Sequence, residues 1–335
     1  MKLFRSAVSL LGVALPLAGC AHLSLLEQHQ SAHPELVHLR GASSSGAFNA
    51  YLRWFSQLVV SDDIYAEIVS MGSGEATDQL MQGKVDFAGS EAPLTDQQLL
   101  KATPQVLAFP VAATAVAIAY NNPDCELKIS SLQLSHILSG KIDNYRQLGC
   151  ANKPIALVYR GDLSGTTATL NSFLLGHHSA WPYARNQGLK LALPLGRAVR
   201  GSQEMLAALK ENDGALGYVD AAYVGSSLRV AALQGGDGLF SLPNASAAER
   251  ALETLQLNSH LIGRVSPSAS GYPLVALNWM LVPVHRSSPR TQALRRALTY
   301  ILGRQGQEDA ELLGYIRLPV HVRDESVRQL SRLPR

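Results

Sequence analysis

The sequence has few of the features that mark metal proteins or nucleic-acid-binding proteins. Cysteine is rare, with 3 among 335 residues, and neither a Cys-x-x-Cys pair nor a Cys/His spacing suited to a metal is present. The formal net charge is only +3, and no block of Lys or Arg argues for a nucleic-acid partner. Internal repeats and low-complexity segments are also missing. We therefore expect no metal, no cofactor and no nucleic acid as a partner.

The N-terminal apolar run is too short to cross a bilayer and has the pattern of an export signal. Lys2 and Arg5 precede an apolar stretch over residues 7–17. The motif Leu17-Ala-Gly-Cys20 resembles the lipobox of bacterial lipoproteins. These features predict a lipoprotein signal peptide and lipidation at Cys20; an ordinary cleaved secretory signal or a short buried segment are the alternatives.

A lipid anchor at Cys20 would place an exported protein in the cell envelope. Removing the expected signal peptide, residues 1–19, takes away two basic residues and no acid, so the formal charge falls from +3 to +1. Residues 20–35 would then form a tether. Several acyl chains hold a protein firmly, whereas one chain binds a membrane only marginally. Ala21 stands where an Asp often retains lipoproteins at the inner membrane, so a periplasmic and an outer-membrane location both stay open.

Three segments share the order of an apolar strand, a turn of small or hydroxyl residues and a helix start. Residues 160–166 follow the apolar run 154–159 and lead into a helical pattern. Residues 41–46 and 72–74 repeat this order. Such helix starts present backbone N–H groups to an anion, although Ser and Thr are also ordinary N-caps. The sequence thus predicts three candidate anion-binding helix starts.

The turn at residues 160–166 also carries a cation. Arg160 offers five donors in a planar fork, and Asp162 could hold its orientation or form only a structural ion pair with it. The turn, Arg160-Gly-Asp-Leu-Ser-Gly-Thr166, resembles the Arg-x-Asp-x-Ser-Gly-Thr signature of periplasmic phosphate-binding proteins, the soluble receptors of phosphate ABC importers. The resemblance spans roughly residues 37–330, and its other segments are residues 41–54, 71–74, 85–94, 214–219 and 315–319.

The resemblance implies an α/β protein with the two-lobed type II fold of periplasmic binding proteins and a ligand cleft between the lobes. Lobe 1 is expected over residues 36–120 and 272–335, and lobe 2 over residues 121–271. The apolar run over residues 106–120 contains Pro110 and is expected to form strands that cross a hinge rather than a helix. A similar run over residues 276–284 could return the chain to lobe 1. One face of the first helix is expected in the core through Phe48, Leu52, Phe55 and Val59.

For the site, the resemblance implies a buried phosphate held by donors from the three helix starts. Charge-assisted hydrogen bonds are worth about 1.5–3 kcal/mol each, and helix termini add partial positive charge. Asp162 would orient the guanidinium. The phosphate-binding residues would be Ser45, Gly46, Ser73, Glu91, Arg160, Ser164, Gly165 and Thr166.

Three positions depart from the family's pattern. Glu91 stands where the family has Asp, which accepts the proton that phosphate carries near neutral pH and repels sulfate, which carries none. Glu keeps this chemistry but is one methylene longer, so the loop or the pocket must differ; a solvated acid beside a Pro turn is the alternative. Ser45 replaces a common Thr and keeps the hydroxyl. Gly46 replaces a larger residue and would leave the wall of the site less filled.

Two cysteines remain if Cys20 is lipidated. In an oxidising compartment Cys125 and Cys150 could form a disulfide, which would contribute about 3 kcal/mol on the chain-entropy estimate. Two free thiols are the alternative.

The function that the resemblance implies is high-affinity binding of inorganic phosphate by a monomer that serves an ABC permease. A surface or outer-membrane lipoprotein that scavenges or senses phosphate or another oxyanion, or that has a non-transport role, is the alternative. A serine hydrolase or phosphatase ranks lower, because Leu163 interrupts a Gly-Asp-Ser turn and no Gly-x-Ser-x-Gly elbow is present. The histidines that could supply a base are His136, His177 and His178, and surface positions are more typical of such residues. We expect a binding protein and no enzyme.

Overall fold

The structure is a computed structural model that describes residues 36–334. The expected signal peptide, the lipidation site Cys20 and the expected tether lie outside the described residues. The helices are α1 (Phe48–Asp62), α2 (Ser73–Met81), α3 (Asp96–Lys101), α4 (Ser131–Leu138), α5 (Gly165–His177), α6 (Gly201–Glu211), α7 (Ala245–Leu252), α8 (Pro289–Leu302), α9 (Arg304–Leu312) and α10 (Val320–Gln329). The 3-10 helices are η1 (Tyr145–Leu148), η2 (Asn186–Gly188), η3 (Ala221–Tyr223) and η4 (Leu330–Arg332).

Within the described residues the strands form a nine-stranded sheet and two small ones. The large sheet has the order β2-β1-β3-β14-β4-β10-β6-β9, and β11 also pairs with β4. Its strands are β1 (Val37–Ser44), β2 (Ile64–Met71), β3 (Phe87–Ser90), β4 (Val106–Tyr120), β6 (Ala156–Arg160), β9 (Arg197–Val199), β10 (Ala215–Asp220), β11 (Arg229–Val230) and β14 (Val275–Pro283). The small sheets contain β13 (Phe240–Ser241), β12 (Ala232–Gln234) and β5 (Lys128–Ile129), and β7 (Ala184–Arg185) and β8 (Lys190–Leu191).

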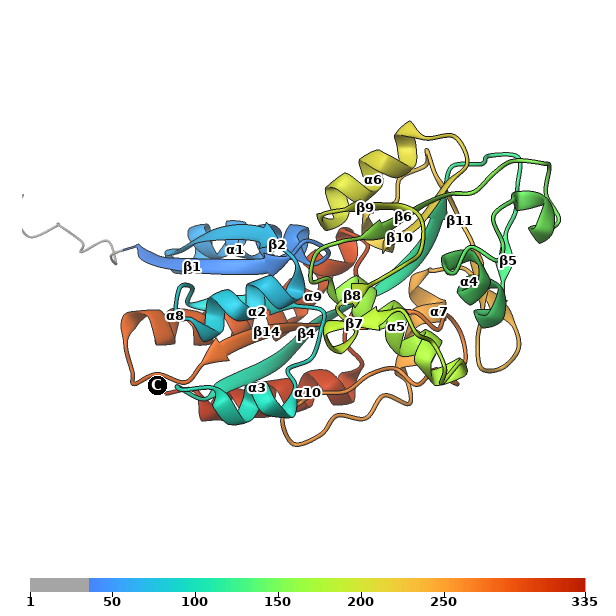
Figure 1. The fold of residues 1–335 in the computed structure, drawn as a ribbon. Coiled ribbons are helices and arrows are strands. Elements are labelled where there is room, and N and C mark those ends of the chain that lie inside the picture. Colours follow the sequence, from blue (N-terminus) through green and yellow to red (C-terminus); the bar gives the residue numbers. More distant parts are fainter. Residues whose placement is uncertain (1–35, 335) are drawn as a thin grey trace, which may run out of the picture. The chain divides into compact units, whose positions relative to one another are not determined.

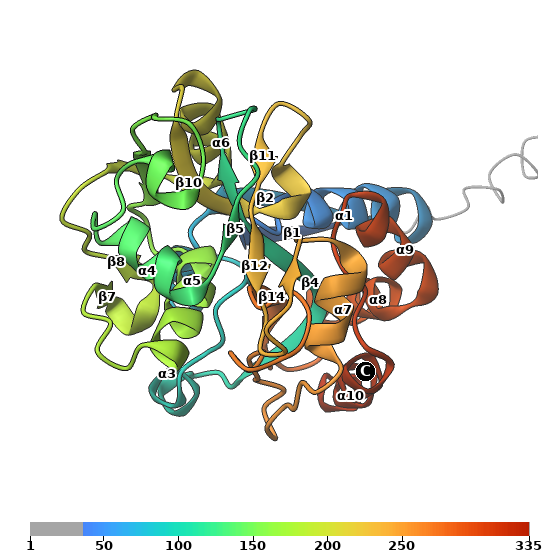
Figure 2. The ribbon, with the colours of Figure 1, turned by 90° about the vertical axis from the view of Figure 1, so that its right-hand side faces the viewer.

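Strand β4 is shared by two halves of the large sheet. Its residues 106–115 pair with β14, and residues 116–120 pair with β10. We call β2, β1, β3 and β14 with the start of β4 the first half-sheet, and β10, β6, β9 and β11 with the end of β4 the second half-sheet. Figures 1 and 2 show β4 (teal) running from one half into the other. All of β4 is buried, and the prediction of strand rather than helix is confirmed for both apolar runs.

Helix α1 packs against β1 and β2 with a face that matches the predicted one only in part, since Phe55 is buried as predicted. Its buried residues are Ala50, Tyr51, Trp54, Phe55 and Leu58. Leu52 and Val59 are 44% and 37% exposed, so placing them in the core was wrong. The two largest aromatic side chains explain the difference, because their polar atoms need buried partners. The Tyr51 hydroxyl donates to the Trp279 carbonyl, and Trp54 Nε1 donates to the Gly306 carbonyl.

Parallel pairing brings the ends of six strands to facing edges. Strands β1, β2 and β3 are parallel, and so are β6, β9 and β10. Because carboxyl ends of parallel strands meet at the same edge, the residues that follow them lie close together. Hydrogen bonds from Arg160 and Ser202 to Ser45 join the two edges. The residues at these strand ends are Ser45, Ser73 and Glu91 in the first half-sheet, and Arg160, Ser202 and Asp220 in the second.

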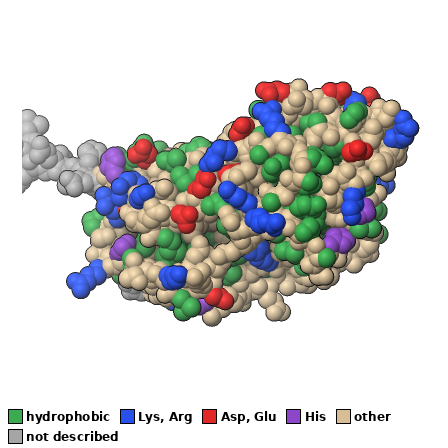
Figure 3. All heavy atoms as spheres, in the orientation of Figure 1, with side chains coloured by type: hydrophobic (Ala, Val, Ile, Leu, Met, Phe, Trp, Pro, Cys, Tyr) green, Lys and Arg blue, Asp and Glu red, His purple; other side chains and the backbone are tan. Residues whose placement is uncertain are grey.

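A disulfide joins Cys125 to Cys150, with their Cα atoms 5.6 Å apart. It connects the segment between β4 and β5 to the residue that follows Gly149, the C-cap of η1. In the described part of the chain, no helix is both long enough and apolar enough to span a membrane. On the face drawn in Figure 3, Lys and Arg side chains are interspersed with Asp and Glu. The lobe boundaries stay a prediction.

Candidate functional site

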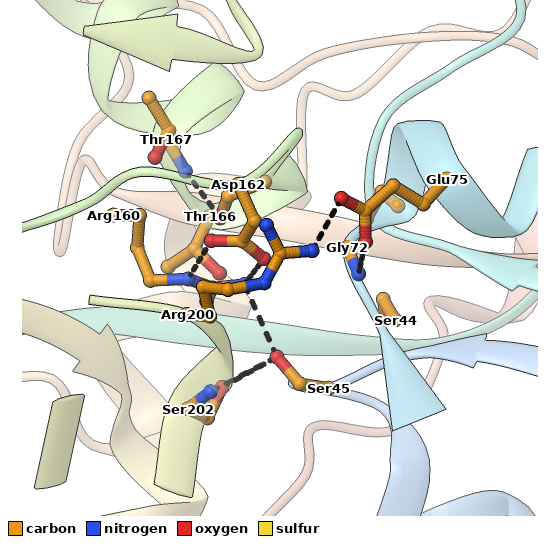
Figure 4. Close-up of polar contacts among 12 residues, drawn as sticks. Ser44, Ser45, Gly72, Glu75, Arg160, Asp162, Thr166, Thr167, Arg200 and Ser202 are labelled. Carbon is orange, nitrogen blue, oxygen red and sulfur yellow. Dashed lines mark hydrogen bonds and ion pairs between the residues drawn. The ribbon is translucent and has the colours of Figure 1, made fainter. Parts of the chain in front are cut away.

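A buried ion pair lies where the two edges meet. Arg160 and Asp162 are each 2% exposed. Arg160 Nε donates to Asp162 Oδ1 at 2.7 Å, and Nη2 donates to Oδ2 at 2.6 Å (Figure 4). Burial alone would lower the pKa of Arg160 and raise that of Asp162, but the hydrogen bonds and charges of the pair outweigh burial and shift both pKa values the opposite way. The guanidinium is therefore charged, oriented and shielded from water.

Ser45 connects this pair to both half-sheets. Its Oγ accepts from Arg160 Nη2 at 3.2 Å and from the backbone N–H of Ser202 at 3.0 Å. The hydroxyls of Ser45 and Ser202 are 3.1 Å apart, and both side chains are buried (Figure 4). Ser202 is the second residue of α6, so a fourth helix start faces the site in addition to the three that the sequence predicted.

The start of α5 offers unpaired donors. Ser164 is its N-cap, and Ser164 Oγ accepts from the Thr167 N–H at 3.2 Å. The hydroxyl proton of Ser164 is not used by this cap. Gly165 and Thr166 are the first two helical residues, whose N–H groups have no acceptor within the helix. The positive end of the helix dipole adds to their attraction for an anion.

The start of α2 lies directly against that of α5. Ser73 is the first residue of α2, and its Oγ accepts from the Glu91 N–H at 3.1 Å. The Gly74 N–H donates to the Leu163 carbonyl at 2.9 Å. A Cβ atom on Gly165 would lie 2.4 Å from Ser73 Oγ, so only glycine permits this approach. The structure thus brings together all the residues that the sequence assigned to the site.

Gly46 faces two carboxylates rather than an underfilled wall. A Cβ atom there would lie 2.2 Å from Glu91 Oε1 and 2.3 Å from Asp220 Oδ2. The prediction that glycine leaves the wall less filled was therefore wrong, because the carboxylates occupy the space that a larger side chain would need. The Gly46 carbonyl accepts a hydrogen bond from the Tyr315 hydroxyl, which fixes the turn. Glu91 is longer than the Asp of the family pattern, and the absence of a side chain at Gly46 leaves the space that its carboxylate occupies.

Glu91 is buried in this site, with 3% of its surface exposed, so the alternative of a solvated surface acid is wrong. Burial raises its pKa well above the ordinary value, and the charge of Asp220 adds to this while Arg160 opposes it. Burial also raises the pKa of Asp220, against the charge of Arg160. Thr166 Oγ1 lies 3.3 Å from Glu91 Oε2 and 3.5 Å from Asp220 Oδ2. The two carboxyl groups therefore titrate as a pair.

Sequence reasoning missed Asp220 and Ser202. Asp220 directly follows the segment 214–219 that carries part of the resemblance, and it is the last residue and the one charged residue of the buried strand β10. Ser202 follows β9, which has only three residues, two of them exposed, and so lacks an apolar run. The signal for Asp220 was present in the sequence, whereas the strand before Ser202 is too short to recognise.

His136 and His177 do not lie at the Ser164 turn. Ser164 stands at the start of α5, whereas His177 is its last residue, thirteen residues further on. At about 1.5 Å per residue, the two lie roughly 20 Å apart. Among the described residues no histidine hydrogen-bonds Ser164, whose Oγ caps the helix. His136 lies on α4, outside the turn.

The chain has recognisable relatives. The sequence profile of the PBP superfamily domain matches residues 29–303, and the chain belongs to this superfamily. It is 27% identical over 302 residues to "Phosphate-binding protein PstS" of Pasteurella multocida, covering 85% of this chain and 87% of that protein. The predicted resemblance is thereby confirmed.

Solved structures share the fold. A high-affinity periplasmic phosphate-binding protein (PfluDING) bound with phosphate matches with a TM-score of 0.75 at 18% identity, covering 87% of this chain and 93% of that one. The phosphate-binding protein from Stenotrophomonas maltophilia matches with a TM-score of 0.72 at 19% identity, covering 86% and 92%. The predicted α/β, two-lobed periplasmic binding protein fold is confirmed.

Proposed function

We propose that the chain binds inorganic phosphate with high affinity as the substrate-binding component of an ABC import pathway. The observation that carries the proposal is Arg160, a buried cation locked by Asp162 at the point where helix starts from both half-sheets meet. The names of its sequence relatives support phosphate as the ligand.

The donors match the needs of a desolvated oxyanion. A phosphate that leaves water must have each oxygen matched by a donor, and charge-assisted bonds contribute about 1.5–3 kcal/mol each. The α5 start supplies two N–H groups and the Ser164 hydroxyl, while the Thr166 hydroxyl is directed at Glu91 and Asp220. The first half-sheet adds the hydroxyls of Ser45 and Ser73 and the amide of Gly46. One guanidinium with these dipoles can hold the ion without further cations.

The position of Glu91 favours an oxyanion that carries a proton as the ligand. A buried carboxylate beside an anion is repulsive unless the anion brings a proton to donate. Phosphate carries such a proton near neutral pH and sulfate does not. Glu91 therefore takes the role that Asp has in the family pattern that the sequence resembles, and its longer side chain fits because Gly46 leaves room.

The chain would work outside the cytoplasm as a monomer without enzyme activity. Cys20 would carry the lipid anchor and a membrane permease would receive the ion. Membrane fractionation tests the anchor, with Cys20→Ala as the variant that should become soluble. Co-purification of a permease would favour import, whereas an outer-membrane fraction with no permease would favour the scavenging or sensing alternative.

Equilibrium dialysis with radiolabelled phosphate tests the ligand. The full-length protein, unfolded and refolded to remove bound ligand, should retain phosphate in the presence of a large excess of sulfate. Glu91→Gln should weaken this discrimination, because an amide can donate to sulfate. Retention of neither ion would contradict the proposal, and so would phosphate ester turnover that disappears in Ser164→Ala.

A further inference from the structure

Asp220 is a buried carboxylate to which the phosphate site described above assigns no role. It ends β10 and is fully buried. Its Oδ1 atom and Glu91 Oε1 have no hydrogen-bond partner among the described residues. Buried polar atoms are rarely left in this way, and these two lie beside the donors of the site.

The two carboxylates face the same small volume. Glu91 Oε1 and Asp220 Oδ2 both lie close to the position of a Gly46 Cβ, at 2.2 and 2.3 Å. Their separation therefore cannot exceed the sum of these two distances. The Thr166 and Ser202 hydroxyls hold Asp220 Oδ2 from two helix starts, at 3.5 and 3.4 Å.

The surroundings favour a proton on this pair, because burial raises the pKa of both carboxyl groups and, once one of them is protonated, the two side chains hydrogen-bond each other. Arg160 is the facing cation, but its Nε and Nη2 donors are committed to Asp162 and Ser45. The other titratable groups that face the pair are buried tyrosines whose pKa values burial raises, so they stay neutral: Tyr51, Tyr223 and Tyr315. Two carboxylates at this separation cannot both be ionised beside a bound anion without a large cost.

We propose that Asp220 is a specificity-determining residue that, together with Glu91, makes the bound complex hold two acidic protons, one more than hydrogen phosphate alone supplies. This inference rests on the proposed phosphate-binding function. Dihydrogen phosphate can bring both protons, or hydrogen phosphate can bring one and the carboxyl pair the other. The proton count of the complex is the same by either route.

The consequence is a pH dependence that a single carboxylate would not give. Once the pH exceeds both the second ionisation of phosphate and the pH at which the free carboxyl pair loses its proton, each further pH unit must raise the Kd of the wild-type protein about tenfold, because one proton is then taken up on binding. A site with one acceptor holds hydrogen phosphate, and its Kd is flat over the same range. Asp220→Asn, which keeps the size and adds a donor, should therefore lose this slope.

Calorimetric titration of the full-length protein with phosphate, from mildly acidic pH to an alkaline pH at which the free carboxyl pair has lost its proton, tests the inference. The expected result at the alkaline end is a tenfold rise in Kd per pH unit for wild type and a flat profile for Asp220→Asn and Asp220→Ser. Asp213→Asn is the matched control, because Asp213 is exposed, pairs with Lys153 and should keep the wild-type slope.

The outcomes separate the inference from the function on which it rests. A flat wild-type profile would overturn it even if no variant folds, and so would equal slopes in wild type and Asp220→Asn. Failure of wild type to bind phosphate at any pH would instead overturn the proposed function.

Discussion

Replacing Asp162 by Asn should destabilise the protein strongly although the two side chains have the same shape. Asp162 accepts both hydrogen bonds that Arg160 directs at it, at 2.7 and 2.6 Å, and both residues are almost fully buried. Removing one partner of a buried pair costs about 3–5 kcal/mol. Asparagine keeps one acceptor oxygen but turns an NH₂ group toward Arg160, so we expect a loss of about 2–4 kcal/mol.

Urea unfolding with the disulfide intact measures this loss. Asp213→Asn serves as the control, since the exposed pair of Asp213 with Lys153 should contribute less than about 1 kcal/mol. The direction in which this stability contribution changes with pH follows from the pKa of Asp162. Because the fold lowers the pKa of Asp162, its contribution is present above the ordinary aspartate pKa and is lost as pH falls through the lowered value. A loss as small as that of the control would refute the claim that the guanidinium is held in a dry site.

Three further changes test separate features. Glu91→Gln should stabilise the protein at neutral pH, because the fold raises the pKa of Glu91. The stability of the wild type therefore falls by about 1.4 kcal/mol per pH unit as the pH rises toward the raised pKa, whereas glutamine does not titrate. Equal unfolding midpoints for wild type and Glu91→Gln at every pH would contradict this. Arg200→Ala removes the 2.8 Å ion pair to Glu75, which links α6 to α2 at an exposed position (Figure 4). It should change stability by less than about 1 kcal/mol but speed phosphate release in stopped-flow measurements, and more so at low salt. Joint replacement of Cys125 and Cys150 by Ala should cost about 3 kcal/mol in urea unfolding, and an unchanged midpoint would count against the disulfide.

The predicted helix starts agree with the structure because their signal is local. In each case an apolar strand ends, a small or hydroxyl residue follows, and a helix begins within a few residues. The structure has these boundaries at Ser164, at Gly72 and after Ser45. Backbone geometry and capping decide such positions, and both are written in neighbouring residues.

Features that depend on distant parts of the chain could not be predicted in the same way. The buried face of α1 is set by carbonyl partners at Trp279 and Gly306, more than two hundred residues away. The fit between Gly46 and the carboxylate of Asp220 likewise appears only when β1 and β10 are brought to facing edges. A sequence pattern gives the type of an element, but these choices are made by tertiary packing.

The most direct test of the central claim is calorimetry of phosphate binding to ligand-free wild-type protein and to Arg160→Ala in parallel. The account predicts tight binding of one phosphate per chain by wild type and a loss of at least about a hundredfold in Arg160→Ala, as removing a charge-assisted anchor of about 3 kcal/mol implies. Equal affinities for the two proteins would show that phosphate binds elsewhere, and the site built around Arg160 would then not be the phosphate site.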